Sequence, residues 1–525
     1  MNGLTTERKP ITDQKLAGSI GKNTLFGVIA SLFQVGTRLV TVPVVISHLG
    51  IAGYGIWSII ITTAAYMRFG STGSRSAFQK YVAEATGTGD FERASQLLST
   101  GTAAMLILSV AGLVPIVFCS EWLARASGVS AEYIYDTKWA ISLFALTMVL
   151  TNSGAAYDAI VVGGHRIDIA RRFSIVLGVS EAVAMITLLH FGFGLIAMAA
   201  VMSLSQLVYL ICTYSVSGRI VPRVQIKLKY VSKRVGGELL RFAGSYQLLN
   251  FLQLVYGAMV PIAILRSSGA FSSGVFAVVT RLMSPIMMCM YAFLLPILSG
   301  GAMVYGSAAS ETMRRLLSKS FKVTLGITLF PLALICVFGL DIIKAWTGQA
   351  DASFPATLWL VSLTTLFQSF SLLALVLYRV SGRGLMDVVR EILRVVSIAP
   401  LLLFPQKFGF MGTLRWVAGA EFVGTVLMLI VVVKTFRAFD LRTIVADALR
   451  LMFATSGIIV IAAIAVSISP ARMSDPRMVA VVKVAEVALV TLLTMFPAMY
   501  LTGAVTKSEA RSILQLFKTK SGVTV

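Results

Sequence analysis

Long apolar segments separated by short polar ones run along almost the whole chain. Each is close to the 20 or so apolar residues that a helix needs to cross the hydrocarbon core of a bilayer. The pattern therefore predicts an all-α, polytopic integral membrane protein with about 14 transmembrane helices. The predicted spans are 23–46, 51–69, 97–119, 139–162, 173–190, 193–215, 242–265, 271–300, 320–340, 354–378, 388–404, 410–433, 451–469 and 478–503.

The first span carries a stripe of small and polar residues. Gly27, Ser31, Gln34, Arg38 and Thr41 are spaced by four, three, four and three residues, which places them on one face of a helix. Such a stripe also serves helix-to-helix packing, because small and hydroxyl residues allow close approach. A cation at lipid depth is costly, and it usually faces a bundle interior or a water-filled cavity. Arg38 therefore favours a hydrated cavity along this face.

Composition agrees with a membrane protein. The 525 residues are 57% hydrophobic and only 13% charged, whereas soluble proteins carry about a quarter charged residues. The net charge of +22 would suggest a nucleic-acid partner in a soluble protein. Here most Lys and Arg fall in loops on one predicted side, including 219–234, 314–322 and 434–450, which leaves Arg38 and Arg281 inside spans. Because basic loops stay on the cytoplasmic side, both termini are predicted to be cytoplasmic.

Several features of the sequence argue against an enzyme. The predicted external loops are short, the longest running over about residues 120–138, and an envelope-assembly enzyme would need an external loop or domain to handle its acceptor. No G-x-x-x-x-G-K-[ST] sequence occurs, so no nucleotide-driven motor is predicted. His48, His165 and His190 lie apart near span ends. We therefore predict a non-enzymatic protein without cofactor or metal.

An internal repeat appears at an offset of 219 residues. It pairs Gly50 with Gly269 and Gly55 with Gly274. The residues that match the polar stripe of the first span are Tyr246, Asn250, Gln253 and Gly257. Because the offset covers six spans, an even number, both halves have the same orientation, an arrangement typical of transporters. The repeat predicts two six-helix pseudo-symmetric lobes and two extra C-terminal helices.

These patterns divide the chain into six expected regions. The predicted regions are a cytoplasmic N-terminal segment (1–22), an N-lobe of helices 1–6 (23–218), a basic cytoplasmic linker (219–237), a C-lobe of helices 7–12 (238–433), helices 13 and 14 (434–503) and a cytoplasmic tail (504–525).

A shared cavity between the halves is the candidate substrate site. The second half lacks Arg38, but it has Arg281 in its second span, so each half contributes one arginine. The predicted lining residues are Arg38, Arg281, Gln34, Ser31, Asn250, Gln253, Tyr246 and Tyr291. Glu181 and Glu421 also lie at lipid depth, where they either carry coupling ions or neutralise the buried arginines.

Three stretches resemble a known transporter family. They read VPVVISHLGIAGYGIWSII, AEATGTGDFERASQLLST and GGHRIDIARR, and they are similar to polysaccharide transporters of the O-antigen flippase type, within the multidrug/oligosaccharidyl-lipid/polysaccharide (MOP) exporter superfamily. The resemblance implies alternating-access transport of an undecaprenyl-diphosphate-linked oligosaccharide across the bacterial inner membrane, for O-antigen, exopolysaccharide or capsule. It implies membrane lipids, a polysaccharide polymerase and glycosyltransferases as partners.

The predicted cavity has the chemistry for such a cargo. Arginine keeps its charge and offers a planar fork that matches phosphate oxygens, and the amide and hydroxyl side chains suit sugar hydroxyls. Two alternatives remain open at this stage. The first is an ion-coupled exporter of organic cations from the same superfamily, which would need a carboxylate-lined cavity. The second is a membrane enzyme of envelope polysaccharide assembly, which would need external catalytic residues.

Overall fold

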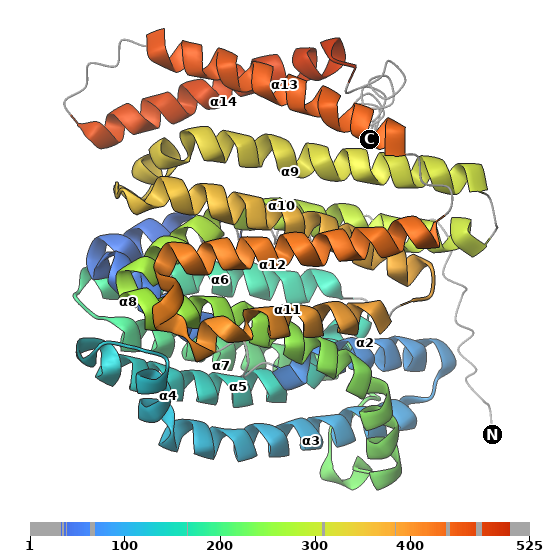
Figure 1. Ribbon diagram of the computed structural model, residues 1–525. Helices are drawn as coiled ribbons and strands as arrows, with labels where there is room; N and C mark the ends of the chain where they lie inside the picture. Colours follow the sequence, from blue (N-terminus) through green and yellow to red (C-terminus); the bar gives the residue numbers. More distant parts are fainter. Residues whose placement is uncertain are drawn as a thin grey trace, which may run out of the picture. The chain divides into compact units, whose positions relative to one another are not determined.

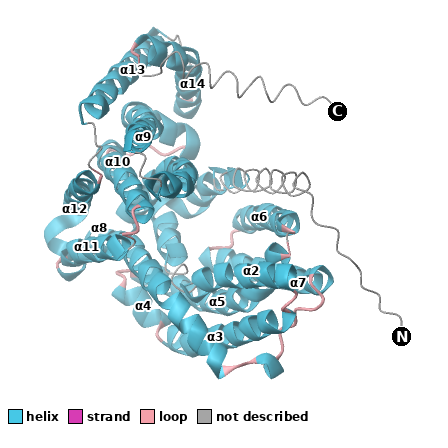
Figure 2. Ribbon diagram, turned by 90° about the vertical axis from the view of Figure 1, so that its right-hand side faces the viewer, coloured by secondary structure: helices cyan, strands magenta, loops and turns pink. Residues whose placement is uncertain are grey.

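The computed structural model describes residues 33, 36–37, 39–62, 69–164, 166–306, 310–383, 385–436, 441–468 and 475–503. The secondary structure of these residues consists of helices joined by loops and turns, without a strand (Figure 2). Eleven helices in the described part are long and apolar enough to cross a membrane. The all-α polytopic fold predicted from the sequence is therefore confirmed.

The helices follow the predicted spans closely. After a first helical stretch whose apolar part is Leu39–Thr62, the α-helices are α2 (Phe69–Thr88), α3 (Phe91–Phe118), α4 (Ser120–Ala126), α5 (Ile134–Gly163), α6 (Ile167–His190), α7 (Leu195–Ile220), α8 (Lys233–Gly306), α9 (Ser310–Thr347), α10 (Ser353–Val380), α11 (Leu385–Leu403), α12 (Pro405–Thr435), α13 (Leu441–Ile468) and α14 (Pro476–Leu501), and the short 3₁₀ helices are η1 (Ala131–Tyr133) and η2 (Leu228–Tyr230).

Two helices fall outside the predicted spans. The residues of α2 include Ser, Thr, Gln and Lys, so a search for apolar runs passes over it. The seven-residue α4 lies in the longest predicted external loop, where Glu121 accepts hydrogen bonds from Arg125 Nη2 at 3.0 Å and Lys138 Nζ at 3.2 Å. The bond from Lys138 connects α4 to the start of α5.

The chain forms two compact units. Unit 1 comprises residues 1–50 and 59–254, and unit 2 comprises residues 51–58 and 255–525. In unit 1, α5 packs against α2, α3 and α7. The core there is formed by Phe78 and Val82 of α2, Leu98 of α3 and several small residues of α5, including Ala155 and Ala159, which are fully buried.

Unit 2 has its core between α8, α9, α10 and α12. Leu294, Phe321, Tyr378 and Met428 are buried together there, and the Tyr378 hydroxyl donates a hydrogen bond to the Met428 carbonyl. The pair α13 and α14, the two helices predicted beyond the repeat, packs against α9 (Figure 1).

The internal repeat is visible in the backbone. Gly50 has φ +70°, and its predicted equivalent Gly269 has φ +78°. Both are the left-handed conformation that glycine adopts without a steric penalty. Each glycine interrupts a helical stretch at the corresponding point, so the two halves make the same turn between their first and second spans.

The equivalent glycines Gly55 and Gly274 form a close helix crossing within unit 2. A Cβ atom at Gly55 would lie 2.3 Å from the Ala270 carbonyl oxygen, and one at Gly274 would lie 2.0 Å from the Ile51 carbonyl oxygen. Ile51 and Ala270 are themselves related by the offset of 219. The contact is therefore symmetric, and only glycine fits at either position.

The ends of two helices in unit 1 meet at a pair of histidines. The rings of His48 and His190 lie 6.2 Å apart in an edge-to-face arrangement. His48 lies at the end of the first predicted span, and His190 is the last residue of α6, the fifth predicted span. Since both helices finish together, they run in the same direction, as strict alternation of the spans requires.

Candidate functional site

Helix α11 carries four charged residues on one face. Asp387, Arg390, Glu391 and Arg394 are spaced by three, four and seven residues from the first, which places them in one stripe. The first three are buried, and Arg394 exposes only 15% of its side chain. Charges in such surroundings must be paired, because removing them from water without partners is prohibitive.

Arg394 holds the centre of a buried network. It donates to Glu421 of α12 from Nε at 2.9 Å and from Nη2 at 2.6 Å. Its guanidinium lies 3.6 Å from the centroid of the Tyr256 ring of α8. Glu421 also accepts from Gln368 Nε2 of α10 at 3.0 Å and from the Tyr256 hydroxyl. One carboxylate thus joins residues from α8, α10, α11 and α12.

A second arginine completes the charge balance. Arg390 Nη1 lies 2.5 Å from Glu391 Oε1, and Arg390 Nε donates to Ser371 Oγ of α10 at 2.5 Å. Glu391 Oε2 is also 3.1 Å from Arg394 Nη1. Two guanidinium groups therefore face two carboxylates, and the network is neutral in sum. Its groups satisfy one another, as buried ion pairs must.

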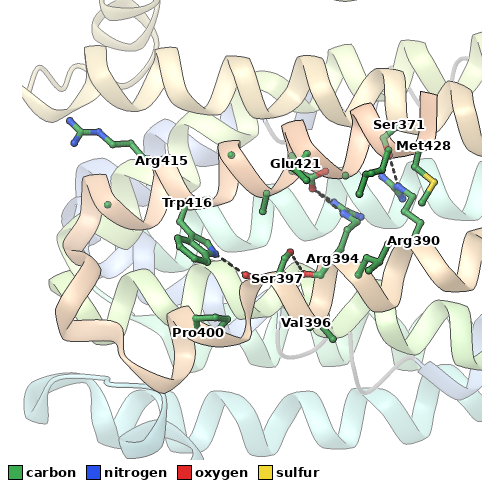
Figure 3. Close-up of a pocket in the computed structure, with 17 residues that line it drawn as sticks. Ser371, Arg390, Arg394, Val396, Ser397, Pro400, Arg415, Trp416, Glu421 and Met428 are labelled. Atoms are coloured by element: carbon green, nitrogen blue, oxygen red, sulfur yellow. Dashed lines mark hydrogen bonds and ion pairs between the residues drawn. The ribbon is translucent and has the colours of Figure 1, made fainter. Parts of the chain in front are cut away.

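A groove of about 710 Å³ runs between α11 and α12 beside this network (Figure 3). Its walls are largely apolar and include Leu393, Val396 and Trp416. Trp416 Nε1 donates to the Ser397 carbonyl at 2.7 Å, which ties the two helices together. Figure 3 shows Arg394 and Glu421 turned toward each other, while Arg415 points away from them. The groove has the size of a ligand pocket and suits a hydrocarbon chain.

The predicted cavity residues are described only in part. Arg281 is half-buried on α8, and its side chain makes no hydrogen bond or ion pair with any residue that the structure describes. Further along α8, Tyr291 is 58% exposed, and Gln253 is also exposed. Ser31, Gln34 and Arg38 lie outside the described residues, as do the side chains of Tyr246 and Asn250.

The first helical stretch nevertheless borders a pocket in unit 1. Phe33, Gly36 and Thr37 line it together with residues of α6 that include Ala182 and Val183, in a volume of about 530 Å³. Glu181, next to Ala182 in the sequence, is half-buried on α6. The residues of the first stretch that line this pocket are not members of the predicted polar stripe. The cavity along that stripe and the ion-coupling role of Glu181 therefore stay predictions.

The arginine that Glu421 neutralises is not one of those predicted to line the cavity. Glu421 pairs with Arg394, not with Arg281. Arg390 and Arg394 also correct the expectation that only Arg38 and Arg281 lie inside spans, because both are buried within α11. Their charges, at helical spacing in an otherwise apolar segment, were the signal that could have revealed them. The role of Glu421 in ion coupling stays a prediction.

No family model and no curated protein sequence matches this chain. Solved structures do match over most of its length. An inward-facing multidrug resistance MATE family transporter of the MOP superfamily aligns with a TM-score of 0.68 at 15% identity, covering 77% of this chain and 95% of that one. The chain has the MOP transporter fold. The lipid II flippase MurJ, in an inward closed conformation, aligns with the same TM-score at 13% identity.

The extent of these alignments differs. The MurJ match covers 90% of this chain and 98% of that chain. A MOP superfamily transporter from Pyrococcus furiosus covers 80% of this chain, with a TM-score of 0.56 and 16% identity. The likeness of fold therefore extends over most of this chain, and the MurJ alignment covers more of it than either of the other two.

Proposed function

We propose that this protein is a flippase that moves an undecaprenyl-diphosphate-linked oligosaccharide across the bacterial inner membrane, with both termini in the cytoplasm. The observation that carries the proposal is Arg281, a half-buried cation without a partner among the described residues. An unpaired guanidinium at lipid depth suits a diphosphate, for which its planar fork provides two parallel hydrogen bonds.

The carboxylates also favour an anionic cargo over an organic cation. Glu391 and Glu421 are both engaged by arginine side chains, so neither is available to a cationic drug in this arrangement. The MOP fold accommodates both cargo classes among the matched structures, whose printed names include multidrug transporters and a lipid II flippase. The distribution of charge therefore supports the choice of cargo.

The cargo is tested in a strain that lacks the protein. We expect undecaprenyl-linked repeat units to accumulate on the cytoplasmic side, where an external glycan-modifying reagent does not reach them. Mass analysis of the trapped units would identify the glycan. Normal export without a trapped intermediate would contradict the proposal and direct attention to organic cations. The expected cellular partners are a polysaccharide polymerase and glycosyltransferases.

Arg281→Ala should abolish export while leaving the protein in the membrane. The reason is the loss of the unpaired guanidinium, and Arg38→Ala should act alike. Arg281→Lys should restore only part of the activity, because an ammonium lacks the planar fork. Arg266→Ala is the matched control on α8, since that exposed arginine donates to the Leu402 carbonyl. Wild-type export by Arg281→Ala, or an equal loss with Arg266→Ala, would contradict the assignment.

The groove between α11 and α12 is our proposed position for part of the isoprenoid chain. Gly419 and Gly424 line it, and a Cβ atom at either would meet no other group within 4 Å. Gly419→Leu and Gly424→Leu should therefore fit without strain, fill the groove and lower export severalfold. Gly457→Leu on α13, where the space is equally open, is the control. Equal export by all three variants would place the chain elsewhere.

A further inference from the structure

The segment that joins α7 to α8 is held firmly on unit 1. Three buried hydroxyl side chains at the start of α3 accept hydrogen bonds from its backbone. Ser95 Oγ accepts from Gln225 N at 3.0 Å, Ser99 Oγ from Lys227 N at 3.1 Å and Thr100 Oγ1 from Ser232 N at 3.0 Å. A loop with backbone bonds of this kind presents its side chains in a fixed arrangement.

Two apolar residues of this segment are buried in unit 1, whereas its charged residues are exposed. Val221 and Val224 are buried against α2, α3 and α5 in the core of unit 1. By contrast, the six cations between residues 219 and 234 are all exposed: Arg219, Arg223, Lys227, Lys229, Lys233 and Arg234. The segment contains no Asp or Glu, and none of the six forms an ion pair with a described residue. The positive charge of this surface is therefore not neutralised by the described protein.

Two apolar side chains of the segment are exposed, like its cations. Leu228, in η2, is 86% exposed between Lys227 and Lys229, and Val231 is 44% exposed one turn later. The segment follows the end of α7 and borders the beginning of α3, so it lies where apolar spans reach a membrane surface. An exposed leucine flanked by lysines at this level can enter the acyl boundary while the ammonium groups remain among the headgroups.

We propose that residues 219–234 form a binding surface for the headgroups of anionic phospholipids in the adjoining leaflet. The exposed cations, none of which forms an ion pair with a described residue, supply the charge complementarity, because basic segments beside a membrane are attracted by acidic lipids. Leu228 anchors the surface, and the hydroxyl groups of α3 keep it in place. This proposal does not depend on the identity of the transported cargo.

Lipid retention by the full-length protein tests this surface. The purified protein is equilibrated in detergent with phosphatidylglycerol or phosphatidylcholine, and the bound lipids are counted by native mass spectrometry. We expect preferential retention of phosphatidylglycerol, reduced severalfold by Lys227→Gln/Lys229→Gln with phosphatidylcholine retention unchanged. Leu228→Ser, which leaves every charge in place, should also weaken retention.

The matched control removes two cations that have a partner. Arg314 and Arg315 lie on another predicted cytoplasmic segment and both pair with Glu311, at 2.9 and 3.1 Å. Arg314→Gln/Arg315→Gln should therefore retain phosphatidylglycerol like the wild type. Equal retention of the two lipids by the wild type would overturn the proposal, as would wild-type retention by both the Lys227→Gln/Lys229→Gln and Leu228→Ser variants. A loss of the same size in the control would overturn it as well.

Discussion

Replacement of Arg394 by methionine is expected to destabilise the protein by about 3–5 kcal/mol, the usual effect of removing one partner from a buried ion pair. The arginine makes two hydrogen bonds to Glu421 and one ion pair with Glu391. Without it, two buried carboxylates face only Arg390. The midpoint of thermal unfolding in detergent, followed by loss of the monodisperse protein, measures the effect.

A second substitution separates charge from packing. In the Arg394→Met/Glu421→Gln variant the remaining charges of Arg390 and Glu391 balance, and the new amide still accepts from Gln368 and Tyr256. This double variant should recover most of the lost stability. Arg383→Met is the control, because the side chain of that exposed arginine donates to Thr435 Oγ1 at 2.9 Å and forms no ion pair with a described residue. The network has no structural role if Arg394→Met and Arg383→Met unfold at the same temperature.

Alanine at Gly274 is expected to drive apart the helices that cross there. A Cβ atom 2.0 Å from the Ile51 carbonyl oxygen cannot be accommodated without movement of the backbone. Overpacking of this kind costs about 1–3 kcal/mol. Conformations with the helices apart should therefore gain about fivefold to a hundredfold in population, and transport should fall accordingly. Gly55→Ala should act alike, because its Cβ would lie 2.3 Å from the Ala270 carbonyl oxygen.

Pulsed electron paramagnetic resonance can measure the separation directly. Spin labels at Ala52 and Phe271 lie on the two helices, and Phe271 is exposed. Both glycine variants should lengthen the distance between the labels. Gly257→Ala is the matched control on α8, since no group lies within 4 Å of its Cβ position. Unchanged distances and full transport in the Gly55→Ala and Gly274→Ala variants would show that the close crossing is dispensable.

The fold could be predicted because each long helix corresponds to a continuous run of apolar residues in the sequence. The turns at Gly50 and Gly269 were also accessible, since the repeat placed both glycines between apolar spans. Polar helices such as α2 leave no such signal. The remaining differences are helix ends, where α9 for example begins at Ser310, ten residues before the predicted span at 320.

The candidate site was less accessible for a physical reason. The network around Arg394 combines Tyr256, Gln368 and Glu421 from three other helices. No local sequence pattern predicts that these residues are in contact. Charged residues near the beginning of an apolar segment also fit a helix end at the membrane surface. Only the packing of α8, α10, α11 and α12 shows that these charges form a buried network and do not mark a helix end at the membrane surface.

The symmetric crossing at Gly55 and Gly274 has a consequence for the origin of the chain. A contact in which each partner presents the same surface is isologous, the kind that two identical subunits form about a twofold axis. In an ancestor of two identical six-helix subunits, one glycine codon would have supplied both sides of this interface. In the fused chain the two sides are encoded separately, and a mutation at either codon is sufficient to disturb both helices.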